Sequence, residues 1–406
     1  MASSVLRSSK FSLYSLQCVK SISAQRRTFT SQLTETQAEM QQLARNFANE
    51  QLKPNAAKLD IEARFPFKYI KQITNLGLMG ACVNNEYGGR GLDYLSLALV
   101  IEELSRGCAS TGMIVAIHNF LYANLVNEKG TDEQKELFLR DYSQGSIGCF
   151  ALSEPGAGTD VAGIRTRATL DGDHWVLNGK KSWVTSATEG SAMAVFATLD
   201  PALKHKGIGC FLVPFETDGV FRGKKEKIMS VRAVTASNVT LEDVRIPKSY
   251  MVGQPGEGFK IAMEQLDQAR VGIAAHAVGI AQSALDTAID YAKERCAFGK
   301  SLTRLPSVKD RLTDMCILVE TARLMTYRAA TDIQTKNSAM AKYIAGKNAA
   351  AVADHCVQIL GGRGLSTDYP AERHYRDARG TQIYGGVTDI QKRLVGHYLL
   401  KEHDAL

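Results

Sequence analysis

The chain has 406 residues, which is long enough for two or three domains with sizeable cores, and its 45% hydrophobic and 22% charged residues are typical of a globular protein. The formal net charge of +7 is modest for this length and gives little support for nucleic-acid binding. Because no stretch approaches about 18 uninterrupted apolar residues, we predict no transmembrane helix.

The eight cysteines are scattered along the chain, without a CxxC pair and without an accompanying histidine cluster. This spacing is typical of free thiols in a reducing compartment and argues against a zinc site. We therefore predict no bound metal.

The first 34 residues contain no aspartate or glutamate and carry five basic residues among many serines. This composition predicts a mitochondrial transit peptide, which we assign to residues 1–31, and hence a location in the mitochondrial matrix. A disordered basic tail is the alternative that composition leaves open. The chain ends in His-Asp-Ala-Leu, which lacks the Ser-Lys-Leu peroxisomal address.

Helical signals fill residues 32–146, which we interpret as an N-terminal α-helical domain. Apolar residues recur at helix spacing, and Pro54 interrupts the first run. The pattern predicts helices or apolar helical stretches over residues 35–49, 67–78, 94–106 and 108–126.

Strand and turn signals replace this pattern over residues 147–250, where we predict a middle β-domain. Asp171-Gly172 and Asn178-Gly179 are both two-residue hairpin signals. The expected strands cover residues 175–177, 183–185, 192–199, 209–214 and 239–246.

Long periodic helices return in residues 251–406. Helices of this length joined by short loops pack antiparallel, so we predict a C-terminal four-helix bundle and an α+β fold class for the whole chain. The expected helices cover residues 259–295, 306–331, 339–360 and 388–400.

The string Cys-Phe-Ala-Leu-Ser-Glu-Pro-Gly-Ala-Gly-Thr-Asp, residues 149–160, joins a short apolar run to a glycine-rich loop. Pro155 stops strand pairing, since it lacks a backbone donor, and the two glycines that follow free the backbone for a tight loop. Such a loop can turn several N–H groups toward one anion, with the hydroxyls of Ser153 and Thr159 beside them. Taken alone, the string would also suit an ordinary turn.

The string resembles the signature of the acyl-CoA dehydrogenase family, and the likeness extends over about residues 33–397. It is also carried by Glu-Glu-Leu-Ser-Arg-Gly-Cys-Ala-Ser-Thr-Gly at 102–112, Gln-Ile-Leu-Gly-Gly at 358–362 and Ala-Glu-Arg-His-Tyr-Arg-Asp-Ala-Arg at 371–379. The short-chain, butyryl-type members are the most similar. The resemblance implies a homotetramer that binds FAD and acyl-CoA and passes electrons to electron transfer flavoprotein.

The resemblance also implies the site residues. The contacts with FAD come from the glycine-rich loop, from a strand that packs on the flavin, and from segments that reach a neighbouring subunit's FAD: Phe150, Leu152, Ser153, Gly158, Thr159, Trp183, Val184, Thr185, Arg295, Phe298, Gln358, Ile359, Leu360, Gly361, Gly362, Val387 and Asp389. The implied contacts with acyl-CoA are Thr159, Asp267, Gln268, Ala269, Arg270 and Gly386. Outside this context, Trp183 would be interpreted as a core aromatic residue, and Asp267 with Arg270 as an ordinary ion pair within a helix.

The family's catalytic carboxylate, which removes a proton α to the thioester carbonyl, has no counterpart here. In short-chain members it lies in an Ile-Tyr-Glu-Gly-Thr string, where this chain has Gly385. Long-chain and isovaleryl members place it just before the arginine that matches Arg270, where this chain has Ala269. We therefore identify no catalytic base.

Neighbouring positions also depart from the family pattern, and other acids or a histidine are possible substitutes for the base. Val387 replaces a flavin-bonding threonine, and Pro306 replaces a glutamine that contacts FAD. Glu264 and Asp267 lie off the helix face of Ala269, and Asp389 has a short side chain four residues past Gly385. His118 is a lone histidine in an apolar helix, which is more often structural.

Three interpretations follow. The first is a working FAD-dependent acyl-CoA dehydrogenase that converts a short-chain acyl-CoA to the trans-2-enoyl-CoA with an unrecognised base. The second is an FAD- and acyl-CoA-binding pseudoenzyme or partner subunit with little catalysis. The third is an acyl-CoA oxidase-like enzyme, which the predicted transit peptide and the length disfavour.

Overall fold

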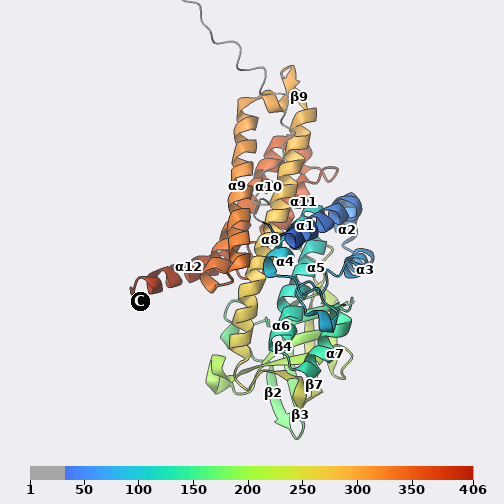
Figure 1. The fold of residues 1–406 in the computed structure, drawn as a ribbon, viewed down its shortest axis with the longest axis vertical. Helices are drawn as coiled ribbons and strands as arrows, with labels where there is room; N and C mark the ends of the chain where they lie inside the picture. The colour runs from blue at the N-terminus through green and yellow to red at the C-terminus, as the bar shows by residue number, and fades with distance from the viewer. Residues whose placement is uncertain (1–32, 144, 406) are drawn as a thin grey trace, which may run out of the picture.

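The computed structural model describes residues 33–143 and 145–405, so the predicted transit peptide lies outside the described residues. A group of helices, a β-sheet and a group of long helices follow one another along the chain (Figure 1). This confirms the predicted α+β class with helical, β and helical parts in that order.

The N-terminal helices begin with a capping box, in which Thr34 and Gln37 each accept a hydrogen bond from the other's backbone N–H. The helix expected over 67–78 ends earlier, at Asn75, because the N–H groups of Leu76 and Gly77 bond back to carbonyls within its last turn. The elements are α1 (Glu35–Phe47), η2 (Ala48–Leu52), η3 (Lys53–Asn55), α2 (Ala56–Glu62), α3 (Phe67–Asn75), η4 (Asn85–Tyr87), α4 (Tyr94–Gly107), α5 (Ala109–Ile117), η5 (His118–Ala123), α6 (Asn124–Lys129) and α7 (Asp132–Ser143).

One helical run, Ala109–Lys129, is long and apolar enough to cross a membrane, judged by its length and composition alone. Its most apolar window of 18 residues is buried inside the protein, because the run packs between α4, α8 and β1. The apolar side chains of this run therefore form part of the hydrophobic core.

The middle part is one mostly antiparallel sheet of eight strands in the order β6-β7-β3-β2-β4-β5-β8, with β1 pairing in parallel to β4. The strand β4 is buried along its whole length, as expected for a central strand covered on both faces. The strands are β1 (Gly148–Ala151), β2 (Arg167–Asp171), β3 (His174–Thr185), β4 (Ala192–Thr198), β5 (Ile208–Pro214), β6 (Val220–Lys225), β7 (Ala236–Pro247) and β8 (Met251–Val252), with short helical turns η6 (Val161–Gly163), η7 (Pro201–Gly207) and η8 (Lys248–Tyr250) between them.

The hairpin signal at Asp171-Gly172 is confirmed, since β2 and β3 pair across it. The signal at Asn178-Gly179 is wrong, because both residues lie inside β3 at an irregularity in its pairing with β7. Gly179 has a φ of +154°, and a Cβ there would lie 2.5 Å from the Thr166 hydroxyl oxygen. The glycine therefore serves close packing within the sheet.

The C-terminal part is built on α8, which packs along α9 and α10, while α11 and α12 pack on α10. In Figure 1, α8, α9 and α10 run side by side and α12 projects from their flank. The predicted helix over 306–331 has the observed bounds, because Pro306 fixes its first turn. The elements are α8 (Gly258–Glu294), β9 (Cys296–Ala297), β10 (Lys300–Ser301), η9 (Leu302–Arg304), α9 (Pro306–Thr331), α10 (Thr335–Leu360), η10 (Gly361–Leu365), α11 (Ala371–Gly380) and α12 (Thr388–Glu402).

Candidate functional site

The glycine-rich loop after β1 is a tight turn that is fixed to β3. The N–H groups of Glu154 and Ala157 each donate to the other's carbonyl, at 3.0 and 3.1 Å, and the Ser182 N–H donates to the Ser153 carbonyl at 2.8 Å. A Cβ built on Gly156 or on Gly158 would meet no atom within 4 Å. One side of the loop is therefore open, while the other side is held by the sheet.

A buried ion pair anchors the same loop. The Lys181 ammonium donates to the Glu154 carboxylate at 2.7 Å and to the Leu152 carbonyl at 3.1 Å. Burial alone would raise the pKa of Glu154. The Lys181 ammonium and the hydrogen bonds from the backbone N–H groups of Thr166 and Arg165 outweigh burial and lower this pKa. Burial lowers the pKa of Lys181 to about 8 despite its partner. Because neither buried charge is stable without its partner, the ion pair holds the loop against β3.

Trp183 is not a core residue. Its side chain is 61% exposed, its φ is +58°, and it lies at an irregularity of β3 between Lys181 and Val184. A non-glycine residue at positive φ is strained, and such strain clusters at binding sites. Because Ser182, its neighbour, is bonded to Ser153, the backbone of Trp183 lies next to the loop, while its indole is exposed. This arrangement fits a flat aromatic group such as a flavin.

The predicted flavin contacts of this loop and strand differ in what they can offer. Ser153 and Thr185 are half-buried, and Gly158 and Thr159 are exposed. The side chains of Leu152 and Val184 are buried in the sheet cores, so these two residues can reach a ligand through their backbone. Phe150 is half-buried and packs its ring 4.9 Å from that of Phe196.

The other predicted FAD contacts lie at the far end of the molecule. Arg295 caps α8 and is exposed, and Phe298 on the β9–β10 hairpin is 91% exposed. Gln358–Gly362 ends α10, with the side chains of Ile359 and Leu360 buried. Because α8 has 37 residues, its two ends lie about 55 Å apart. Its first residue packs on β5 of the sheet, so one chain cannot bring both groups to one ligand (Figure 1).

The acyl-CoA contacts expected on α8 form a partly buried polar cluster. The Arg270 guanidinium pairs with Asp267, which also accepts from the Thr335 hydroxyl at 2.6 Å. Burial raises the pKa of Asp267, and Arg270 opposes this rise. Among the described residues, none forms a hydrogen bond with the Arg270 Nε, although it is buried. Gln268 donates to both carboxylate oxygens of Glu128, at 3.0 and 2.9 Å.

The two base positions of the resemblance meet in space. Gly385 has a φ of +66°, and a Cβ built on it would point at Ile273, 2.8 Å from its Cγ1. Ala269 is buried and precedes Ile273 by four residues on α8, so both lie on one helix face. The structure therefore brings Gly385 and Ala269 to one wall, and neither carries a carboxylate.

Three buried hydrogen bonds hold this wall, and the sequence indicated none of them. Tyr384, just before Gly385, shares a hydrogen bond with His276 Nε2 at 3.0 Å, and His276 Nδ1 shares one with the Ser105 hydroxyl at 2.9 Å. Burial lowers the pKa of His276 to about 3, so the imidazole is neutral. Lys342 of α10 donates to the carbonyl of Gly386. Isolated polar residues in alanine-rich helices gave no sequence signal.

The other candidates for a catalytic base are paired with a cation, hydrogen-bonded or exposed. Glu264 pairs with Lys129 at 2.7 Å. His118 Nδ1 accepts from the Gly148 N–H at 3.0 Å, and burial lowers its pKa to about 4, so its role is structural, as expected. Asp389 is exposed in the first turn of α12, next to the half-buried Val387.

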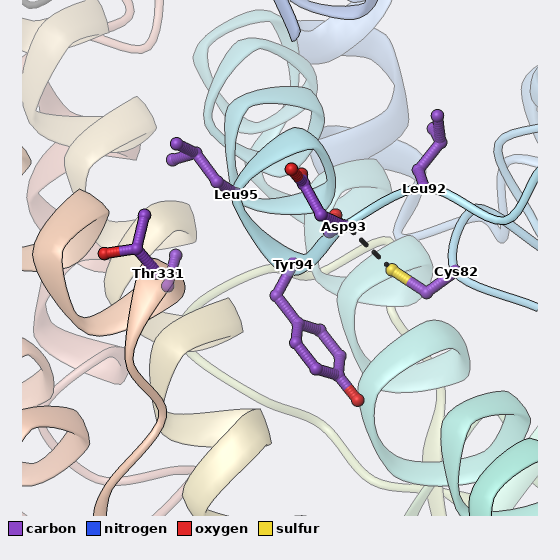
Figure 2. A pocket seen from close by; sticks show the side chains of 7 residues that line it. Cys82, Leu92, Asp93, Tyr94, Leu95 and Thr331 are labelled. Carbon is purple, nitrogen blue, oxygen red and sulfur yellow. Dashed lines mark hydrogen bonds between the residues drawn. The ribbon is translucent and has the colours of Figure 1, made fainter. Parts of the chain in front are cut away.

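A cavity of about 480 Å³ lies between the start of α4 and the end of α9, and Figure 2 shows its lining. Tyr94 and Leu95 come from α4, Thr331 comes from α9, and the Cys82 thiol donates to the Asp93 carbonyl. The Tyr94 hydroxyl is bonded to Glu128, which in turn holds Gln268. The cavity thus adjoins the polar cluster of α8. No sequence motif indicated it.

Across residues 33–143 and 145–405, no group of three or more His, Cys, Asp or Glu residues could hold a metal ion. The cysteines of this part of the chain are all free.

Models of the acyl-CoA dehydrogenase N-terminal, middle and C-terminal domains match residues 34–146, 149–244 and 256–400. The mitochondrial short-chain specific acyl-CoA dehydrogenase of Bos taurus is 49% identical over 378 residues, which cover 92% of each chain. The structure of butyryl-CoA dehydrogenase from Megasphaera elsdenii superposes with a TM-score of 0.89 at 38% identity, covering 91% of this chain and 99% of that chain. A glutaryl-CoA dehydrogenase from Mycobacterium smegmatis in complex with FADH2 gives 0.86 at 29% identity, covering 90% and 95%.

The match of all three domain models in one order, together with relatives that share nearly half of the residues over almost the whole chain, establishes the resemblance seen in the sequence. This protein belongs to the acyl-CoA dehydrogenase family.

Proposed function

We propose that the protein is an FAD-dependent acyl-CoA dehydrogenase that removes hydrogen from Cα and Cβ of a short-chain acyl-CoA and releases the trans-2-enoyl-CoA. The observation that carries the proposal is the exposed Trp183, strained at positive φ beside the open glycine-rich loop. This is where a flavin and a thioester can stack in the family fold. Short chain length is supported by the 49% identical relative.

The residues present fit FAD. We assign its flavin end to the open loop and the Trp183 strand, with Val387 and Asp389 nearby, and its adenosine end to Arg295, Phe298 and Gln358–Gly362 of a second copy of the chain. Bound FAD supplies a two-electron acceptor for hydride. Arg295 is an exposed cation at a helix end, which suits a pyrophosphate.

The chain's own residues bind and orient the thioester. Thr159 is exposed on the loop, and Gly386 is exposed after the base position. The polar cluster of α8 is linked through Gln268 and Glu128 to Tyr94, which lines the cavity of Figure 2. The unpartnered Arg270 Nε leaves a cation free to donate to a polar group of the CoA portion. The apolar wall of Ala269 and Ile273 would exclude water from the reacting carbons.

The finer assignments are parts of the same proposal. The division of FAD contacts between the two ends of α8 supports a homo-oligomer, and the resemblance makes it a homotetramer. Electron transfer flavoprotein is the partner that the resemblance implies as electron acceptor. The acid-free N-terminus and the mitochondrial relative support the mitochondrial matrix.

The comparisons give no support to the alternative of a binding protein with little catalysis. The oxidase-like alternative has no feature of the site in its favour. Dehydrogenation is therefore the function we retain.

Product analysis tests the proposal. Purified protein, reconstituted with FAD, is incubated with butyryl-CoA and a ferricenium acceptor. We expect a CoA ester two hydrogens lighter than butyryl-CoA, at a yield that depends on FAD. Unchanged butyryl-CoA in the presence of bound FAD would contradict the proposal.

A further inference from the structure

Lys342 is a buried lysine without an acid. Lys342 lies on α10 and is only 1% exposed, and its amine donates a hydrogen bond to the Gly386 carbonyl. Within the described residues no carboxylate lies within ion-pair distance of it. Lys181, the other fully buried lysine named above, has Glu154 at 2.7 Å. Burial without a carboxylate favours the neutral amine.

The surroundings of Lys342 reinforce this preference. Burial and then the Arg270 cation of α8 lower the pKa of Lys342 to about 7. The other charged groups on the elements packed against α10 do not offset these two effects. Three acids are paired with cations: Asp267 of α8 with Arg270, Glu320 of α9 with Arg323, and Glu402 of α12 with Lys336. Asp389 of α12 is exposed, and Arg379 of α11 donates to Gln382. A group that is neutral near pH 7 is poised to accept a proton.

The amine also lies at the wall that lacks a carboxylate. Its hydrogen-bond partner Gly386 is the residue next to Gly385, whose missing side chain would face Ile273. A neutral amine that donates one N–H to Gly386 keeps its lone pair free.

The other polar groups at this wall cannot act. Both nitrogens of His276 are engaged, one with Tyr384 and one with Ser105. Asp267 is bound by Arg270 and Thr335. Lys342 is the basic group that remains.

We propose that the Lys342 amine is the catalytic base of this protein and takes the place of the family carboxylate. The inference rests on the proposed function. The Cα–H bond of the acyl-CoA breaks, its proton forms a new N–H bond at Nζ, and the electron pair left on Cα forms the Cα=Cβ bond. The β-hydrogen would leave with its electron pair, for which bound FAD would supply the two-electron acceptor, so that the acyl chain is oxidised and the flavin is reduced. The ammonium that results stays hydrogen-bonded to Gly386.

Substitution with arginine separates a base from a structural lysine. Lys342→Arg keeps a cation that donates to Gly386 but cannot accept a proton, and Lys342→Met removes both properties. We expect both variants to bind FAD and to reduce it with butyryl-CoA about 10²–10⁴-fold more slowly than wild type under anaerobic conditions. Lys336→Met, on the same helix in an exposed ion pair with Glu402, is the matched control and should react at the wild-type rate.

The pH profile and a rescue complete the test. Because the amine is neutral above its pKa, the wild-type rate should rise as the pH is raised through about 7, and Lys342→Arg should lose this rise. Adding Ala269→Glu to Lys342→Met should restore the rate at least tenfold, with a rise at lower pH. Wild-type rates in Lys342→Arg, with the pH profile unchanged, would overturn the inference and leave the proposed function standing.

The two failures are distinguishable. If wild type does not reduce FAD with butyryl-CoA but Ala269→Glu does, the site binds its substrate as proposed and Lys342 is not a base. If both bind FAD and neither reacts, the proposed function itself is wrong, and the inference falls with it.

Discussion

Gly385 shows at the scale of one residue why a carboxylate cannot simply be returned to the loop. A side chain there must adopt a φ of +66° and place its Cβ 2.8 Å from Ile273. The left-handed conformation alone costs about 1–2 kcal/mol for a non-glycine residue. Ala269 already carries a Cβ in helical backbone, so it is the better position for an added acid.

We expect different effects of an alanine substitution at two glycines. Gly385→Ala should destabilise the protein by about 1–3 kcal/mol, through strain and contact with Ile273. Gly396→Ala, in α12 with no atom within 4 Å of the added Cβ, should be neutral or stabilise by about 0.4–1 kcal/mol. Thermal unfolding midpoints of the two variants compare them. Equal midpoints would show that Gly385 is not strained.

At the scale of elements, the Glu154–Lys181 pair joins the glycine-rich loop to β3. We expect Glu154→Gln or Lys181→Met to destabilise the protein by about 3–5 kcal/mol, because each leaves a buried charge without its partner. The double variant removes both charges and should be more stable than the sum of the two single effects. Strict additivity in chemical denaturation would refute the coupling.

Because of the same ion pair, we expect the loop to lose stability at acidic pH. Since the pKa of Glu154 is lowered below its ordinary value of 4.5, its contribution to stability is present above that value and is lost as the pH falls through the lower folded-state pKa. FAD should therefore dissociate more readily as the pH drops below about 4.5, as measured by free flavin fluorescence. In the double variant this part of the acid sensitivity should disappear.

The sequence predicted elements well where one local signal decides them. Periodicity and Pro306 were sufficient for α9, and Asp171-Gly172 for the β2–β3 turn. Asn178-Gly179 misled because the same dipeptide suits a turn and a bulge, and the choice depends on Thr166, distant in sequence. The candidate site divides in the same way. Motifs predicted contacts for Trp183 and Arg270, whereas the hydrogen bonds of Lys342 and His276 form only when α8, α10 and the Gly385 loop come together.

At the scale of the whole molecule, the predicted FAD contacts lie at two ends of a helix about 55 Å long. The FAD site that we propose therefore uses two chains. Arg295→Ala should weaken FAD retention severalfold while leaving the circular dichroism spectrum unchanged, because the residue is exposed in one chain. Light scattering should give an oligomer, and a monomeric mass with FAD fully bound would contradict this account.

The most direct test of dehydrogenation by this protein is an anaerobic titration of the FAD-loaded protein with butyryl-CoA, followed by the visible absorbance of the oxidised flavin. The account predicts loss of this absorbance as butyryl-CoA is added, approaching one equivalent per FAD, with enoyl-CoA as the product. Full retention of oxidised flavin absorbance, in protein that binds butyryl-CoA, would contradict it.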